Sequence, residues 1–417
     1  MDGRRQHSVP RVVWVVAAVA AVGLCLPLLW HQIHAQPPNR LVDLEVYRDA
    51  GESVRIGRDV YQHRTPLPQA LAFTYPPFAA LLSLPLALAS FTTAAWAWEV
   101  VSLLLLIWLV AFCFRPLVPV WRAWLDPKIG TARAAWATAL LAPMVLPAIA
   151  WLEPVRTTFR FGQVNVLIAA LVVADCCTAF TRWPRGMLIG VAAAIKLTPG
   201  LFIPYLWLSG RRRAAYVATA TFVGCQLLAA AVVPDDSKQY WTDALFNSER
   251  LGSNAATANV AIRGALLRLH LPHPIFIGLV VIGVLAFLVI GMSRALLASK
   301  AGAELAGVAL VGLTSVAVSP VSWDHHLIWL VPAFALLLAD PWRPRRLLAA
   351  AAAGALFYTR IPWTAARLLR STEGIADAWW RTLNLSFTIA VLILVVALPL
   401  KSLTQLSRPW GTRSRPL

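Results

Sequence analysis

Long apolar blocks separated by short polar segments recur along the whole chain. Most are close to the ~20 residues that a helix needs to cross about 30 Å of hydrocarbon. No alternating pattern of the kind found in membrane barrels accompanies them. The clearest blocks cover residues 12–30, 94–114, 166–180, 214–233, 275–297, 303–318, 327–339, 347–361 and 383–400. Because a segment in lipid must satisfy its own backbone hydrogen bonds, the pattern predicts an all-α fold, a polytopic integral membrane helical bundle with about eleven or twelve transmembrane helices.

Two further apolar blocks are interrupted. Pro85 divides residues 78–89, which either cross the bilayer or only dip into it. Lys196 and Pro199 divide residues 187–208, and arginines stand at both ends of that block. The second block either crosses once, which leaves one arginine cluster on the unfavoured side, or enters and leaves on one side as two half-helices.

Four polar islands lie between the apolar blocks, at residues 31–77, 153–165, 234–273 and 319–326. The first contains an amphipathic stretch, residues 42–60, which predicts a short helix on the membrane surface. It also holds several of the chain's 19 acidic residues: Asp43, Glu45, Asp49, Glu52 and Asp59. Counting crossings places the polar islands on one face of the membrane.

The charge distribution supports this orientation. The chain carries a net charge of +18, but a composition of 59% hydrophobic and 13% charged residues excludes a soluble globular protein. No basic face with interleaved aromatic residues stands outside the apolar blocks, so we expect no nucleic acid partner. The basic residues cluster at the ends of the blocks, as the positive-inside rule requires. This predicts a multi-pass protein of the plasma membrane with cytoplasmic N- and C-termini, polar islands on the extracytoplasmic (periplasmic) face, and contacts with anionic membrane lipids.

Asp43 is the leading candidate for chemistry. It follows the first span closely, where a carboxylate is partly desolvated and still reaches a polar substrate, as suits a general base that takes a proton from a sugar hydroxyl. The alternative is that Asp43 only caps the helix that follows it. Glu45 is the neighbouring carboxylate, and on a helix the two side chains point to different faces.

Cationic and amide side chains supply candidate ligands for a phosphate and for sugars. Lys196 stands in an otherwise apolar block, which indicates a phosphate contact unless the side chain only snorkels to the interface. Arg156 and Arg160 could meet the same phosphate or an acceptor headgroup, or anchor the chain at the interface. Gln163 and Asn165 stand at the entrance of a span, where amides suit sugar hydroxyls as well as helix-end hydrogen bonds.

His325 and His326 follow Asp324 in the fourth island. Adjacent side chains on a helix diverge by about 100°, so a contact from one histidine to a phosphate or a hydroxyl is favoured over a metal site. The cysteines lie in apolar blocks without C-x-x-C spacing, which also gives no metal site and no disulfide framework. Several aromatic residues either stack on sugar faces or anchor the chain at the interface. They are Tyr61, Tyr75, Trp323, Trp329, Trp379 and Trp380.

Five short motifs occur in order along the chain. They are D-L-E-V-Y at 43–47, Y-P-P at 75–77, G-Q-V-N at 162–165, A-I-K-L-T-P at 194–199 and H-H at 325–326. In this combination the sequence resembles the actinobacterial polyprenol-phosphate-mannose-dependent α-1,2-mannosyltransferases, glycosyltransferase family 87 of the GT-C superfamily of membrane glycosyltransferases. The resemblance covers most of the chain and is greatest to the phosphatidylinositol-mannoside mannosyltransferase branch.

The resemblance implies one GT-C glycosyltransferase domain over residues 1–417. Its parts would be a catalytic first extracytoplasmic loop at 31–77, a large extracytoplasmic loop at 234–273 and a cytoplasmic tail at 401–417. The implied enzyme moves mannose from a polyprenyl-phosphate-mannose donor to the 2-hydroxyl of a mannose on a phosphatidylinositol mannoside acceptor, with Asp43 as the base.

The residue types fit that reaction. A β-linked donor that gives an α-linked product inverts the anomeric centre, so one carboxylate base and a leaving phosphate suffice, and we expect no cofactor and no metal. The donor phosphate would meet Lys196, Arg160, His325 and His326. Substrate contacts would fall to Glu45, Tyr47, Tyr61, Tyr75, Arg156, Gln163, Asn165 and Trp323.

Other functions remain open from the sequence. Within the same chemistry, the alternatives are the α-1,2-branching mannosyltransferase of lipomannan and lipoarabinomannan, and an arabinosyltransferase, which usually carries additional outer domains. A different class is a lipid or sugar transporter or flippase. Transporters often contain inverted repeats and charged residues near the bilayer midplane. No such repeat is visible, and polar islands gathered on one face favour chemistry at the membrane surface.

Overall fold

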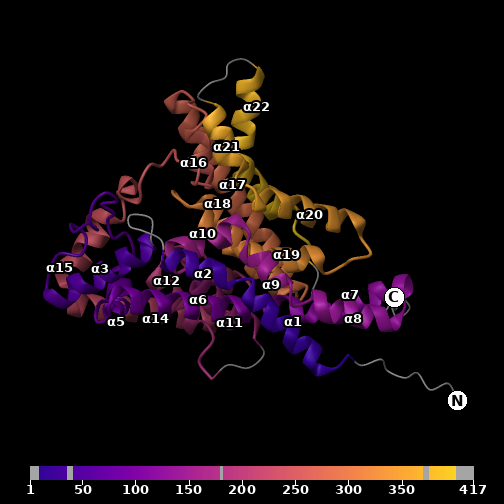
Figure 1. The fold of residues 1–417 in the computed structure, drawn as a ribbon. Coiled ribbons are helices and arrows are strands. Elements are labelled where there is room, and N and C mark those ends of the chain that lie inside the picture. Colours follow the sequence, from indigo (N-terminus) through magenta and orange to yellow (C-terminus); the bar gives the residue numbers. More distant parts are fainter. Residues whose placement is uncertain (1–8, 35–40, 179–181, 370–374, 401–417) are drawn as a thin grey trace.

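The computed structural model describes residues 9–34, 41–178, 182–369 and 375–400, and helices make up most of this part of the chain (Figure 1). These residues form no β-strand, and their only extended pairings are two isolated bridges, Arg64 with Ala72 and Asn259 with Trp323. The predicted all-α fold is therefore confirmed.

The helices differ widely in length. Those longer than ten residues are α1 (Arg11–Gly23), α3 (Val42–Ile56), α6 (Phe91–Phe114), α7 (Val118–Ile129), α8 (Thr131–Leu141), α11 (Asn165–Cys177), α14 (Arg212–Val232), α17 (His273–Lys300), α18 (Glu304–Val318), α20 (Pro344–Tyr358) and α23 (Ser386–Ala397). The shorter ones are α2 (Leu26–Ile33), α4 (Pro77–Leu82), α5 (Leu84–Ala87), α9 (Val145–Ala150), α10 (Glu153–Phe161), α12 (Met187–Ile195), α13 (Phe202–Leu208), α15 (Pro234–Gln239), α16 (Ile262–Leu267), α19 (Leu330–Leu338), α21 (Ile361–Leu368) and α22 (Ile375–Asn384).

Several helical segments can cross a membrane. Among the described residues, 4 are long and apolar enough, or up to 6 if each of two bent pairs counts as one span. The segments are Arg11–Ile33, Phe91–Ile129, Arg212–Val232 and His273–Lys300, and the bent pairs are α10 with α11 and residues 377–384 with α23. A polytopic membrane protein is confirmed. The sequence predicted about eleven or twelve spans, and the count by helix length and hydropathy is lower. The difference arises because predicted blocks such as 303–318 and 327–339 form helices shorter than a full crossing.

The apolar helices divide into a core and a periphery. Helix α18 is buried on all sides from Leu305 to Ala317. Helix α17, which packs beside it, keeps large apolar side chains exposed, among them Ile282 at 66% and Val289 at 62%. An apolar helix that is exposed along its length suits a lipid environment. The core of the bundle is thus α18 with its neighbours, and α17 faces lipid.

The interrupted block 187–208 folds as two half-helices. Helix α12 ends at Ile195, Lys196 is extended (φ −149°, ψ 129°), and a 3₁₀ turn leads into α13. Residues at both outer ends of the block, including Arg185 and Arg211, line one cavity of about 660 Å³. The chain therefore leaves and returns to the same end of the bundle, and of the two alternatives the structure has the re-entrant one.

The polar islands meet at the opposite end. The backbone N–H of Val60 donates to Asp236 Oδ1 over 2.8 Å, which joins the first island to the third. Helix α10 of the second island packs against the 3₁₀ turn Asp324–Trp329 of the fourth. The predicted gathering of the islands at one end is confirmed. The predicted cytoplasmic tail 401–417 and the N-terminal residues 1–8 lie outside the described residues.

Candidate active site

Helix α3 and the corner between α10 and α11 form the frame of the site. Asp43 lies in the first turn of α3. Gly162 ends α10 with φ +68°, and the chain bends by 114° before α11. A Cβ atom on Gly162 would lie 2.8 Å from Cβ of Leu44, so the corner packs directly on the turn that carries Asp43. The resulting contact brings Gln163 and Asn165, just after the corner, to the N-terminal end of α3.

Two tyrosines hold the amide of Gln163. The hydroxyls of Tyr47 and Tyr75 each lie 3.1 Å from Gln163 Oε1 and 2.8 Å from one another. Because Oε1 accepts from the tyrosines, the amide nitrogen of Gln163 is left to donate on its other side. That nitrogen supplies the side-chain hydrogen bond to the Asp43 carboxylate. The tyrosine pair therefore orients a donor toward the candidate base.

The Asp43 carboxylate is half-buried, and its environment changes its proton affinity. Burial raises the pKa of Asp43 to about 6, while the hydrogen bond from Gln163 and the charge of Lys196 lower it in part. A carboxylic acid with this pKa is mostly ionised at neutral pH and a stronger base than an ordinary aspartate. Asp43 thus has the proton affinity that a general base requires.

Lys196 lies in the break between the half-helices, close to Asp43. Its ammonium donates to Asn165 Oδ1 over 3.0 Å and lies 2.9 Å from His326 Nε2, and it sits 5.4 Å from the ring centroid of Tyr75. Within the described residues it forms no ion pair. An ammonium has three N–H donors, so one remains for a ligand. Asn165 and His326 hold this nitrogen in place, and Asp43 is the nearby carboxylate whose charge interacts with that of Lys196. An ammonium in this position can contact a bound anion.

The two histidines have different surroundings. His326 Nε2 lies within hydrogen-bond distance of Lys196 Nζ, at 2.9 Å. His325 is buried, and its ring lies edge-on to Phe161. Within the described part of the chain neither ring nitrogen forms a hydrogen bond, and Nδ1 lies 3.8 Å from Asp324 Oδ1. Its backbone carbonyl accepts from Asn165 Nδ2 and Thr158 Oγ1, at 2.9 and 3.1 Å. Of the pair, His326 belongs to the Lys196 cluster, and the backbone of His325 fixes Asn165.

The remaining sequence candidates lie around this cluster without joining it. Tyr61 is buried and donates to the backbone carbonyl of Tyr75 over 2.8 Å, so it supports Tyr75. Arg156 pairs with the buried Glu153, which also pairs with Arg360. Their position indicates that Tyr61 and Arg156 stabilise the frame of the site.

Three more candidates stand at its edges. Arg160 lies in the last turn of α10, with its guanidinium 5.6 Å from the ring centroid of Phe161. Trp323 is half-buried and bridges to Asn259 through its backbone. Glu45 lies two residues beyond Asp43 on α3, about 200° around the helix axis, and therefore on another face.

Sequence reasoning missed the polar residues that fix the histidine turn. Thr157 Oγ1 donates to Oδ2 of the buried Asp324 over 3.2 Å. The fully buried Asn259 accepts from the backbone N–H of Ser322 over 3.1 Å. Thr157 and Asn259 both lie in polar islands, and this position was the only sign in the sequence that they have a role. Their hydrogen-bond partners are distant in sequence, so the sequence could not identify them.

Known proteins similar to this chain are membrane mannosyltransferases. The model of glycosyltransferase family 87 matches residues 73–320. The chain is 34% identical over 421 residues to a polyprenol-phosphate-mannose-dependent alpha-(1-2)-phosphatidylinositol mannoside mannosyltransferase of Mycobacterium tuberculosis, covering 97% of this chain and 96% of that protein. A protein of the same description from Mycolicibacterium smegmatis is 34% identical over 410 residues, 93% of this chain and 91% of its own.

A further relative from Mycobacterium tuberculosis is described as a phosphatidylinositol pentamannoside mannosyltransferase. It is 34% identical over 338 residues, 79% of this chain and 73% of its own length. No solved structure matches the chain.

Proposed function

The chain belongs to glycosyltransferase family 87, and from this membership we propose that it transfers mannose from polyprenyl-phosphate-mannose to the 2-hydroxyl of a mannose on a phosphatidylinositol mannoside. The product linkage is α-1,2, and the anomeric centre is inverted. The observation that carries the mechanism is the juxtaposition of a base, Asp43, with the amine of Lys196, which Asn165 holds in place.

The reaction uses Asp43 as its general base. The acceptor hydroxyl oxygen attacks C1 of the donor mannose while its proton passes to the Asp43 carboxylate. The bond from C1 to the phosphate oxygen breaks, and its electron pair stays on the departing polyprenyl phosphate. Inversion needs one carboxylate and an open path to the face opposite the leaving group.

Lys196 serves the leaving phosphate. Negative charge grows on the phosphate oxygens as the C1–O bond breaks, and a fixed ammonium in a partly dry site stabilises that charge without reorganising. Asn165 and His326 hold the ammonium in place. Arg160 and His325 are further candidates for the donor phosphate, at the edge of this cluster.

The substrate contacts follow from the same frame. Gln163, Tyr47 and Tyr75 form a connected polar surface beside Asp43, suited to sugar hydroxyls. Glu45, on another face of α3, and Trp323, beside the histidine turn, are further candidates for substrate contacts. The reaction takes place on the extracytoplasmic face of the plasma membrane, where both lipid substrates are embedded, and the chain acts as one catalytic domain.

A transfer assay tests this proposal. Purified protein receives polyprenyl-phosphate-mannose and a phosphatidylinositol mannoside, and the lipids are analysed by mass spectrometry. The expected product is heavier than the acceptor by one hexose, which an α-1,2-mannosidase removes. A product only on lipomannan would assign the chain to the branching enzymes, and movement of lipid across vesicles without any product would assign it to the flippases.

A further inference from the structure

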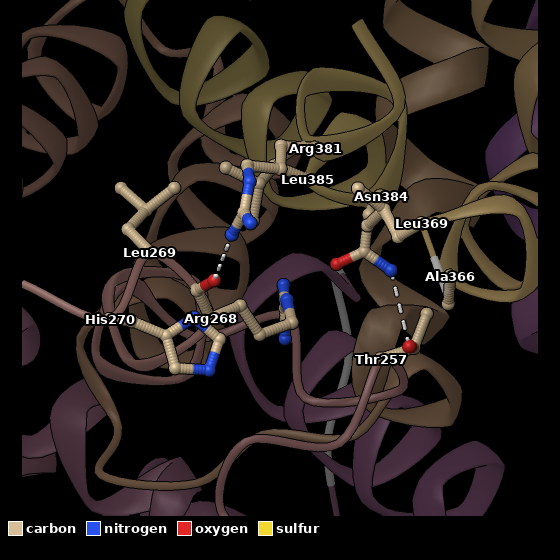
Figure 2. A pocket seen from close by; sticks show the side chains of 9 residues that line it. All are labelled: Thr257, Arg268, Leu269, His270, Ala366, Leu369, Arg381, Asn384 and Leu385. Atoms are coloured by element: carbon tan, nitrogen blue, oxygen red, sulfur yellow. Dashed lines mark hydrogen bonds between the residues drawn. The ribbon is translucent and has the colours of Figure 1, made fainter. Parts of the chain in front are cut away.

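A second polar cavity lies between α16, α21 and α22, the group of helices at the top of Figure 1. Its volume is about 250 Å³. Figure 2 shows the side chains of Arg268, His270 and Arg381 gathered around it, with Thr257 and Asn384 on the far side. The volume is below the ~300–1,000 Å³ of a pocket that encloses a drug-sized ligand, so the cavity fits a headgroup rather than a whole lipid.

The cavity is cationic. Arg268 donates through Nη1 to the carbonyls of Ala256 and Asn259, both at 2.8 Å. Its buried Nε has no hydrogen-bond partner among the residues that the structure describes. No carboxylate forms an ion pair with Arg268 in the described part of the chain. Arg381 pairs with Asp377 over 2.6 Å. Of the two guanidinium groups, only that of Arg381 has a carboxylate partner among the described residues, so the cavity attracts an anion.

A short segment connects this cavity to the candidate active site. Thr257 lines the cavity. The carbonyl of the next residue, Ala258, accepts a hydrogen bond from the backbone N–H of Asp324 over 2.8 Å. Val260 N–H donates to the carbonyl of Ser322 over 2.7 Å. One face of residues 256–260 therefore borders the cavity, and the same segment supports the turn that carries His326.

Lipid-facing surface adjoins the cavity. Helix α22 exposes Trp379 at 61%, and the first turns of α17 expose Ile275 at 53% and Ile277 at 45%. A tryptophan on an amphipathic helix is typical of a membrane interface. A lipid that places its headgroup in the cavity can keep its acyl chains along these apolar side chains.

We propose that this cavity binds the phosphodiester of the acceptor glycolipid, an inference that rests on the proposed function. The donor phosphate is bonded to the mannose that is transferred, so it must lie at Asp43 and Lys196. The phosphodiester of a phosphatidylinositol mannoside is separated from the accepting mannose by inositol and other sugars. A phosphate site at a distance from the base therefore suits the acceptor and not the donor.

The test uses variants that reduce the cavity's positive charge and leave Arg268 in place, because Arg268 also holds two backbone carbonyls. Arg381→Gln removes one guanidinium. His270→Gly removes the imidazole, and glycine accepts the φ of +53° found there. The matched control is Arg367→Gln, an exposed position on α21 whose side chain donates to Thr364 Oγ1 over 3.4 Å.

Kinetics separate the acceptor from the donor. For the double variant Arg381→Gln, His270→Gly we expect the KM for the phosphatidylinositol mannoside to rise about tenfold or more, with the KM for polyprenyl-phosphate-mannose unchanged. A soluble α-mannoside without a phosphodiester should react equally well with the variant and the wild type. A rise in the donor KM alone, or no change in either, overturns the proposal.

Binding is measured independently of turnover. Phosphatidylinositol should raise the melting temperature of the full-length wild type and of Arg367→Gln, but not of the double variant, and inorganic phosphate should have little effect. If the wild type transfers no mannose yet shows this pattern, the proposed function fails while the cavity remains a lipid-phosphate site. If transfer occurs and phosphatidylinositol binds all variants alike, the cavity assignment fails.

Discussion

At Asp43, two opposing effects set the reactivity of a single carboxylate. Burial raises its pKa to about 6, and the hydrogen bond from Gln163 and the charge of Lys196 keep it from rising further. The tyrosines fix the Gln163 amide, so the balance depends on side chains from three separate segments. A carboxylate tuned in this way is ionised when substrate arrives and can still accept a proton.

The substitution Asp43→Asn tests the base directly. An amide has nearly the same shape but cannot take the hydroxyl proton, so the transfer rate should fall by about 10²–10⁴-fold. The rate is measured with radiolabelled donor at saturating acceptor. The matched control is Glu52→Gln, a partly exposed position on the same helix whose pair with Arg55 contributes little. Near-normal turnover by Asp43→Asn would remove Asp43 as the base.

The pH dependence of transfer follows from the same pKa. Only the ionised carboxylate acts as a base, so below about pH 6 the rate should fall toward tenfold per pH unit. Lys196→Met removes a charge that lowers the Asp43 pKa, and the acidic limb should then move to higher pH. The profile of kcat/KM for wild type and variant measures this. An acidic limb at the same pH in both proteins would show that the two groups are not coupled.

Residue types and spacing predicted part of this site. Asp43, Gln163, Asn165 and Lys196 stood out because polar groups at the ends of apolar blocks are costly unless they are used. The structure brings these four residues together. Arg156 looked equivalent in sequence, but Glu153 three residues earlier forms an ion pair with it. The sequence alone did not show that the buried carboxylate of Glu153 would pair with Arg156 and Arg360.

At the scale of secondary-structure elements, two features position the site residues: the corner between α10 and α11, and the break between α12 and α13. The break at Lys196 was visible in sequence, because a charged residue followed by Pro199 cannot continue an apolar helix. The sequence could not show whether block 187–208 crosses the membrane or returns to the same side. That depends on whether its two ends lie together in the folded protein, which is a tertiary contact. The corner at Gly162 was not predicted as a bend, because a single glycine before a span is a weak signal.

Gly162 should not tolerate a side chain. In Gly162→Ala the residue keeps φ +68°, which costs about 1–2 kcal/mol for an L-residue, and the new Cβ meets Leu44 at 2.8 Å. We expect a lower melting temperature in detergent and a loss of transfer activity, because α11 shifts relative to Asp43. Gly278→Ala on α17, where no heavy atom lies within 4 Å, is the control. Equal melting temperatures for the two variants would contradict the packing argument.

At the scale of the whole molecule, the candidate active site and the arginine cluster 211–213 lie at opposite ends of the bundle. Helices α11, α12 and α14 run between them. The Asp43–Lys196 cluster lies at one end, and at the other Arg185 and Arg211–Arg213 line the cavity of about 660 Å³. Arginines that gather at one end of apolar helices mark the cytoplasmic side.

This separation predicts which face of the membrane each end meets. Gln62 is exposed beside the site, and Arg213 is exposed at the arginine end. In intact cells, Gln62→Cys should react with a membrane-impermeant maleimide, and Arg213→Cys only after permeabilisation. The wild type is the control for the natural cysteines, of which Cys25 and Cys113 are fully buried. The opposite labelling pattern would place Asp43 in the cytoplasm. A carrier lipid presented on the outer leaflet could not then reach the base, and the direction of transfer proposed for this chain would be wrong even if its chemistry were right.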